Sequence, residues 1–141
     1  MTTFHHPLRI YYEDTDAGGV VYYANYLRFF ERCRTEWLRS LGHEQIDLLT
    51  THDIAFVVKS VSIDYKRPAR LDDALEVGLR LTHRGRAQLQ FEQWVDRLNR
   101  DGTRETLVTG SVKLACVNLK TLRPVSIPDW LNSRLQPSDA S

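Results

Sequence analysis

The sequence predicts an α+β fold in which one long helix packs against a curved sheet of about five mainly antiparallel strands. Apolar residues recur at helical spacing in one long segment, alternate with polar residues in several later segments, and tight turns join those later segments. A single helix among these strands excludes the repeated strand–helix–strand pattern of nucleotide-binding folds. Because such a sheet leaves edges and one face to be covered, we also expect an oligomer.

The first third of the chain carries a strand, an acidic loop and the long helix. Leu8–Tyr12 is a short β-type run that leads into the glycine-terminated loop Glu13–Gly19. The helix predicted over Tyr22–Leu41 ends at Gly42, a typical stop signal. Its apolar stripe is wide enough to require a partner surface and consists of Tyr26, Phe30, Cys33, Trp37 and Leu41.

The remaining chain predicts four strands joined by short connections. A short helix is expected first, at Glu44–Thr50. The strands follow at Ile54–Tyr65, Ala74–Thr82, Leu89–Val95 and Leu107–Val117. Turns are expected around Pro68, Gly85 and the hairpin Asn99–Gly102. Pro124, Pro128 and a polar end predict an irregular C-terminal tail.

Size and charge restrict the class of protein. The 141 residues predict a single domain over 1–141, with a core at about 8–118 and a tail at 119–141. Lys and Arg number 19 against 18 Asp and Glu, so no overall field favours nucleic acid or an anionic membrane. No segment approaches the ~20 apolar residues that span a bilayer, and the N-terminus lacks the pattern of a secretory signal. A cytoplasmic protein that does not insert into membranes is expected.

Cysteine and histidine usage argues against disulfides and metals. The two cysteines, Cys33 and Cys116, lie in apolar segments and are expected to be reduced core thiols. The five histidines show no spacing typical of metal ligands, so no metal site is expected.

The segment Tyr12–Tyr26, YEDTDAGGVVYYANY, is the most informative part of the chain. It places two acids and two glycines between a strand end and a helix start. Unpaired backbone N–H groups in the first helical turn, around Val21–Ala24, could stabilise an oxyanion. A carboxylate on the same loop could activate water or attack a carbonyl itself. From the residues alone, acids that merely cap the helix remain the stronger interpretation.

Residues Tyr11–Arg39, YYEDTDAGGVVYYANYLRFFERCRTEWLR, resemble the signature of the hotdog-fold acyl-CoA thioesterases of the 4-hydroxybenzoyl-CoA thioesterase family. They are most similar to the bacterial branch associated with the Tol-Pal system. The similarity continues through Ala55–Asp73 and covers roughly Leu8–Val117. The family's fold is one long helix surrounded by a five-stranded sheet, in agreement with the predicted element order.

The resemblance implies the roles of individual residues. The second aspartate of the D-x-D-x-x-G run, the catalytic acid of the family, is Asp16, and the oxyanion donor is the backbone N–H of Tyr23. Many members of the family have histidine where this chain has Tyr23, a change that leaves a backbone donor intact. The remaining substrate-binding positions implied by the motif are Gly18, Gly19, Val20, Val21 and Asn25.

Two other acids compete for the catalytic role. Asp14 is expected to brace the loop or the helix entry, and Glu31 to form ion pairs with neighbouring arginines. In the resembling family, basic residues around the turn that here holds Arg84 and Arg86 meet the nucleotide end of coenzyme A, so these two residues are candidate coenzyme A contacts. A second basic cluster, at Lys66, Arg67 and Arg70, is a weaker candidate for the pantetheine channel.

The function implied by the resemblance is hydrolysis of an acyl-CoA thioester to a free acid and coenzyme A. Coenzyme A would be part of the substrate, with no separate cofactor. The resemblance also implies a homodimer at minimum, with a homotetramer expected and acyl carrier protein as an alternative thioester donor. Two other functions stay open: a hotdog dehydratase or hydratase, and a non-catalytic scaffold that binds acyl thioesters or proteins.

Overall fold

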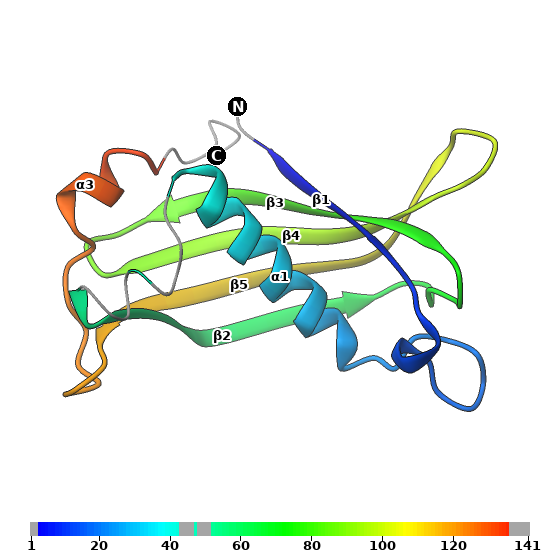
Figure 1. The fold of residues 1–141 in the computed structure, drawn as a ribbon, viewed down its shortest axis with the longest axis horizontal. Coiled ribbons are helices and arrows are strands. Elements are labelled where there is room, and N and C mark those ends of the chain that lie inside the picture. The colour runs from blue at the N-terminus through cyan, green and yellow to red at the C-terminus, as the bar shows by residue number, and fades with distance from the viewer. Residues whose placement is uncertain (1–2, 43–46, 48–51, 136–141) are drawn as a thin grey trace.

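A five-stranded antiparallel sheet curves around one long helix in the computed structural model, which describes residues 3–42, 47 and 52–135 (Figure 1). The strands lie side by side in the order β1-β3-β4-β5-β2. The helices and strands are β1 (Phe4–Arg9), α1 (Asn25–Ser40), β2 (Ile54–Tyr65), β3 (Ala74–Arg84), β4 (Gln88–Leu98), β5 (Arg104–Asn118) and α3 (Asp129–Asn132). This arrangement confirms the predicted α+β hotdog fold.

The curvature of the sheet coincides with irregularities in its register. The pairing shifts between Val58 and Ser60 on β2, between Leu81 and His83 on β3, and between Val95 and Asp96 on β4. Each such bulge bends its strand and increases the local twist. The three bulges therefore help the sheet to wrap around α1 instead of lying flat beside it.

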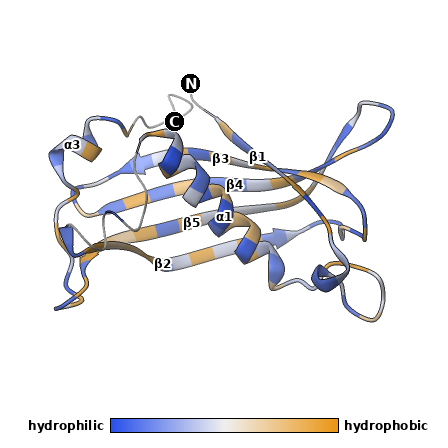
Figure 2. Ribbon diagram, viewed as in Figure 1, coloured by the Kyte–Doolittle hydropathy of each residue, from blue (hydrophilic) through white to orange (hydrophobic). Residues whose placement is uncertain are grey.

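The helix packs directly on the concave face of the sheet. Its Phe30 side chain is fully buried, and a Cβ added to Gly110 on β5 would come within 2.7 Å of the Phe30 ring. Glycine at this position lets α1 approach the sheet closely. Apolar and polar residues alternate along the strands, as Figure 2 shows, and the apolar ones form the core under the helix.

Two boundaries near the N-terminus differ from the prediction. The first strand is Phe4–Arg9 instead of Leu8–Tyr12, and Tyr12–Asp14 forms a short 3₁₀ helix. Pro7 is accommodated because β1 is an edge strand that pairs only with β3. The long helix begins at Asn25 instead of Tyr22, because the preceding backbone is bonded to other segments.

The predicted irregular C-terminal tail has no helix or strand at residues 119–128, but it contains one short helix, α3 (Asp129–Asn132), that was not predicted. Ile127, Leu131 and Leu135 recur every fourth residue, a helical spacing that the neighbouring prolines obscured. All three are buried in the core, and Leu131 lies on α3. The expected short helix at Glu44–Thr50 lies outside the described residues, apart from Asp47.

The edge strand β2 is unusually exposed for an apolar strand. Val57, Val58, Val61 and Tyr65 are each between 41% and 52% exposed. No other strand of the described sheet pairs with the outer side of β2. Within the described ranges, no helix is long and apolar enough to cross a membrane.

Candidate active site at the start of the long helix

The acidic loop is folded back on itself by hydrogen bonds between its own backbone groups. The Asp16 N–H donates to the Val20 carbonyl at 2.9 Å, and the Gly19 N–H donates to the Asp16 carbonyl at 3.0 Å. Gly19 has a φ of +78°, a conformation that a side chain would strain. Asp16 therefore lies at the base of a tight turn, with its position set by two backbone contacts.

The Asp16 carboxylate is exposed and held by one short contact. Its Oδ1 accepts a hydrogen bond of 2.9 Å from the Gly18 N–H, and no other described residue donates to this carboxylate. A Cβ at Gly18 would lie 3.3 Å from Asp16 Oδ1, so glycine there leaves room for the carboxylate. One oxygen is thus fixed and the other remains available to water or to a carbonyl carbon.

Of the four backbone N–H groups at residues 21–24, just before the helix, two donate hydrogen bonds to other described residues and two do not. The Val21 N–H donates to the Ala69 carbonyl at 2.8 Å, and the Tyr22 N–H to the Asp14 carbonyl at 3.1 Å. The next two N–H groups, those of Tyr23 and Ala24, donate to no acceptor in the described part of the chain. These free groups precede the first helical turn, where the helix dipole places partial positive charge. The predicted donor, Tyr23, is therefore available, whereas the N–H of Val21 is not.

Asp14 braces the loop, as predicted, and Asn25 fixes the helix to it. The Asp14 Oδ2 accepts from the Tyr11 N–H at 2.9 Å, so this carboxylate is engaged within the loop. The side-chain Nδ2 of Asn25, a residue only 9% exposed, donates to the Asp14 carbonyl at 2.9 Å. The Asp14 side chain thus fixes the loop, and the Asn25 side chain, predicted as a substrate-binding position, fixes the helix start to that loop.

A second loop, Lys66–Asp73, supports the site from the side, a role that the sequence did not indicate. Its Ala69 is fully buried, with its carbonyl bonded to Val21 and its N–H donating to the Tyr26 hydroxyl at 3.0 Å. Burial raises the pKa of Tyr26, which keeps this hydroxyl protonated. No spacing rule links residues 21 and 69, because their contact depends on the tertiary fold.

Arg97 on β4 holds that second loop in place. Its Nη2 donates to the Pro68 carbonyl at 2.6 Å and its Nε to Asp73 Oδ2 at 3.0 Å. Its Nη1 donates to Glu105 Oε1 at 3.1 Å. The guanidinium therefore joins the loop to β5 through three acceptors, and the Lys66–Asp73 loop in turn holds the segment that leads to Tyr23.

A cleft of about 230 Å³ adjoins Tyr23. The rings of Tyr23 and Tyr65 meet edge to face at 6.1 Å, and those of Tyr26 and Tyr65 lie 5.7 Å apart. Lys66 and Arg67 also line the cleft. The structure thus places two members of the second basic cluster in the same cleft as Tyr23, and Arg67 also forms an ion pair with Glu105.

The two other predicted basic residues lie elsewhere. Arg84 and Arg86 flank the turn between β3 and β4, at the end of β3 away from the loop. Because β3 has 11 residues, its two ends lie roughly 35 Å apart. Arg84 Nη1 donates to the carbonyls of Asn132 and Leu135, and Arg86 Nε donates to Ser126 Oγ at 2.7 Å. Within one chain, neither residue is brought near Asp16.

Glu31, the other competing acid, lies two turns along α1 and accepts a 3.5 Å hydrogen bond from Thr35 Oγ1. Its neighbour Arg34 is substantially buried, which lowers the pKa of the guanidinium, while Glu31 opposes that shift. The predicted ion pairs of Glu31 do not form, since no arginine of the described ranges lies within salt-bridge distance of it, and its effect on Arg34 acts over a longer distance.

Residues 11–135 match the family model of the thioesterase-like superfamily. An acyl-CoA thioesterase YbgC from Haemophilus influenzae is 50% identical over 125 residues, covering 89% of this chain and 88% of the relative. An acyl-CoA thioester hydrolase YbgC from Escherichia coli O6:H1 is 42% identical over 127 residues, covering 90% and 91%.

Solved structures of thioesterases have the same fold as this chain. A probable thioesterase from Bartonella henselae superposes with a TM-score of 0.81 at 34% identity, covering 90% of this chain and all of the other. A 4-hydroxybenzoyl-CoA thioesterase variant in complex with 4-hydroxybenzoyl-CoA superposes with a TM-score of 0.88 at 17% identity, covering 95% and 99%, and supports the fold alone. The chain therefore belongs to the thioesterase-like superfamily and, within it, to the family of the YbgC acyl-CoA thioesterases.

Proposed function

We propose that this chain hydrolyses acyl-CoA thioesters to a free carboxylic acid and coenzyme A, with Asp16 as the catalytic carboxylate and the Tyr23 N–H as the oxyanion donor. The observation that carries the proposal is that one short segment, residues 16–23, carries both a carboxylate with a free oxygen and a backbone N–H that donates to no described residue. The family of the relatives supports the reaction type.

The chemistry needs little more than these two groups. The thioester oxygen gains negative charge when the carbonyl carbon is attacked, and a donor at the helix start stabilises that charge. Asp16 either takes a proton from the attacking water or attacks the carbon itself to give an acyl anhydride that water then opens. In both routes the C–S bond breaks, the thiolate leaves with coenzyme A, and water supplies the OH of the acid. No cofactor takes part, since coenzyme A arrives with the substrate.

The proposal also includes the oligomeric state of the protein. The exposed apolar edge of β2 is suited to pairing with the same edge of a second copy, which would hide Val57, Val58 and Val61 from water. A homodimer is the minimum assembly, and a homotetramer is the expected one. Arg84 and Arg86, far from Asp16 in one chain, could then serve coenzyme A only at a site on a neighbouring subunit.

The cellular setting is proposed from the family resemblance. The protein is placed in the cytoplasm, with the Tol-Pal-associated branch of the family, and acyl carrier protein is proposed as a second carrier of its acyl substrates. Nothing in the described structure favours the dehydratase or the scaffold over the hydrolase.

Release of free thiol tests the reaction type. The purified protein is mixed with acetyl-, hexadecanoyl- and benzoyl-CoA, and thiol is followed with a chromogenic disulfide. Hydrolysis of at least one member above the uncatalysed rate supports the proposal. A protein that binds acyl-CoA and releases no thiol would instead be a scaffold, and one that adds or removes water at the acyl chain would be a hydratase or dehydratase.

A further inference from the structure

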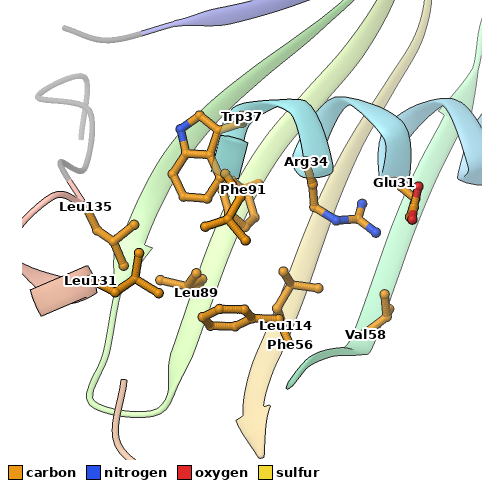
Figure 3. Close-up of a pocket in the computed structure, with 11 residues that line it drawn as sticks. Glu31, Arg34, Trp37, Phe56, Val58, Leu89, Phe91, Leu114, Leu131 and Leu135 are labelled. Carbon is orange, nitrogen blue, oxygen red and sulfur yellow. The ribbon is translucent and has the colours of Figure 1, made fainter. Parts of the chain in front are cut away.

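The two halves of α1 are supported by different parts of the fold. Farther along the helix, the Trp37 ring meets the Phe91 ring of β4 edge to face at 5.2 Å, and both rings line an apolar cavity (Figure 3). Neither Asp16 nor Tyr23 lines that cavity. The start of the helix lies instead beside the end of β2 (Figure 1), where Tyr65 is the last residue of the strand. The support for the helix start comes from this strand end.

The backbone around Tyr23 is held unevenly. The N–H groups of the two preceding residues donate hydrogen bonds of 2.8 and 3.1 Å, and the Tyr22 carbonyl accepts from the Asn25 N–H at 2.9 Å. The Tyr23 carbonyl has one backbone donor, the Tyr26 N–H, at the longer distance of 3.3 Å. The N–H of the same peptide, that of Ala24, donates to no described residue. The peptide that follows Tyr23 is thus held by a single long backbone hydrogen bond.

Tyr65 adds side-chain support at this point. Its hydroxyl donates to the Tyr23 carbonyl at 3.5 Å, a long and weak hydrogen bond. Burial, and to a smaller extent the neighbouring Tyr23, raises the pKa of Tyr65, so the hydroxyl keeps its proton at neutral pH. The two rings meet edge to face with centroids 6.1 Å apart, an arrangement that aromatic pairs favour. Among the described residues, Tyr65 is the only one whose side chain bonds to the Tyr23 backbone.

Tyr65 is itself fixed on several sides. Its backbone pairs with Val108 of β5, and the N–H groups of the two residues that follow it both donate to the Leu107 carbonyl, at 2.8 and 3.1 Å. Its ring also lies 5.7 Å from the ring of Tyr26, which is buried and bonded through its hydroxyl to the second loop. The ring therefore joins a well-anchored strand end to the start of the helix.

We propose that Tyr65 is a positioning residue for the oxyanion donor, an inference that rests on the proposed thioesterase function. Its ring holds Tyr23 in place, and the backbone N–H thereby keeps its direction toward the thioester oxygen. Tyr65 acts through Tyr23, because the carbonyl that it bonds and the N–H that binds the oxyanion belong to peptides on opposite sides of the Tyr23 Cα. Small displacements of a catalytic group are costly, so the loss of this support lowers turnover more than substrate affinity.

Removal of the ring tests the proposal in steady-state kinetics. Tyr65→Ala should lower kcat at least about tenfold and change KM by less than about twofold. Tyr65→Phe keeps the ring and loses only the weak hydrogen bond, so its kcat should stay within about threefold of the original value. Tyr12→Ala removes the same side chain where it is 82% exposed and should leave both constants unchanged. A kcat of Tyr65→Ala equal to that of Tyr65→Phe or of Tyr12→Ala overturns the proposal.

A double-mutant cycle separates positioning from an effect of β2 on assembly. The donor is a backbone group, so Tyr23→Ala keeps the N–H and removes the ring that Tyr65 contacts. If Tyr65 acts through that ring, the kcat of the double variant should lie within about threefold of that of Tyr65→Ala. Losses that multiply, as independent effects do, overturn the positioning role.

The mobility of the Tyr23 amide provides a test that needs no activity. Its ¹⁵N order parameter should be about 0.85 in the unmodified protein and in Tyr65→Phe, and should fall to about 0.6 or lower in Tyr65→Ala. An unchanged order parameter in Tyr65→Ala overturns the proposal. A protein that releases no thiol from any acyl-CoA overturns the thioesterase function instead, and the amide measurement then still decides whether Tyr65 holds Tyr23.

Discussion

The side chain of Asn25 donates a hydrogen bond of 2.9 Å to the backbone carbonyl of Asp14. This contact joins the first residue of α1 to the loop that carries Asp16, so it helps to set the position of that loop relative to the helix start, where the free N–H of Tyr23 lies. Asn25 is nearly buried, and no water can easily replace its amide. The geometry of the proposed site therefore depends on a residue that is not expected to touch the reacting atoms.

Replacing Asn25 by alanine should lower turnover more than substrate binding. We expect kcat to fall about tenfold or more, because small displacements of catalytic groups are costly, and the unfolding free energy to fall by about 1 kcal/mol. Steady-state kinetics and urea unfolding measure the two effects. An unchanged kcat in a correctly folded Asn25→Ala protein would show that this contact does not position the site.

Replacing Tyr26 by phenylalanine should destabilise the fold. The buried Ala69 N–H then loses the hydroxyl that accepts its 3.0 Å hydrogen bond, at an expected cost of about 1 to 3 kcal/mol. Urea unfolding checks this value. The matched control is Tyr12→Phe, which removes a hydroxyl from a side chain that is 82% exposed, and we expect no measurable change in its unfolding free energy.

Replacing Arg97 by methionine should affect both stability and activity. The change leaves the Asp73 and Glu105 carboxylates and the Pro68 carbonyl without their shared donor, and we expect a loss of about 2 kcal/mol. Because Arg97 holds the Lys66–Asp73 loop, kcat should fall as well, with KM less affected. Arg100→Met, at an exposed position, is the control, and equal effects of the two substitutions would contradict the assigned role of Arg97.

Stability should decline at alkaline pH because both cysteines are buried as thiols. Burial raises the pKa of Cys33 from 9.0 to about 12 and that of Cys116 to about 11. Between pH 9 and 12 the unfolded chain releases these protons while the folded chain retains them, so rising pH favours unfolding. Chemical denaturation at pH 8 and pH 10.5 should show the loss, and Cys33→Ala should show a smaller one. An equal loss in both proteins would contradict the role of Cys33.

Much of the fold follows from local periodicity in the sequence. The stripe around Phe30 and Cys33 and the alternation along Ile54–Tyr65 depend on near neighbours, and both elements were predicted with only small boundary errors. The helix in the tail was missed because Pro124 and Pro128 mask the spacing of Ile127, Leu131 and Leu135. Here tertiary burial, more than local propensity, fixes the structure.

The candidate site was predictable only in its contiguous part. Asp16, Gly18 and Tyr23 lie within eight residues and follow a recognisable motif. The support from Ala69 and Arg97 and the aromatic wall formed by Tyr65 come from distant segments, and only the three-dimensional arrangement brings them together. Arg84 and Arg86, predicted from the sequence as coenzyme A contacts, also anchor the C-terminal segment, a role that only the tertiary structure reveals.

The kinetics of Asp16→Asn test the account most directly. The substitution keeps an oxygen that can accept the Gly18 N–H and removes the negative charge and the basicity. We predict that kcat/KM for the best acyl-CoA falls by at least about 100-fold, while the melting temperature and the circular dichroism spectrum stay those of the unmodified protein. A folded Asp16→Asn protein that retains kcat/KM within about threefold of the original value would contradict the assignment of Asp16 as the catalytic carboxylate.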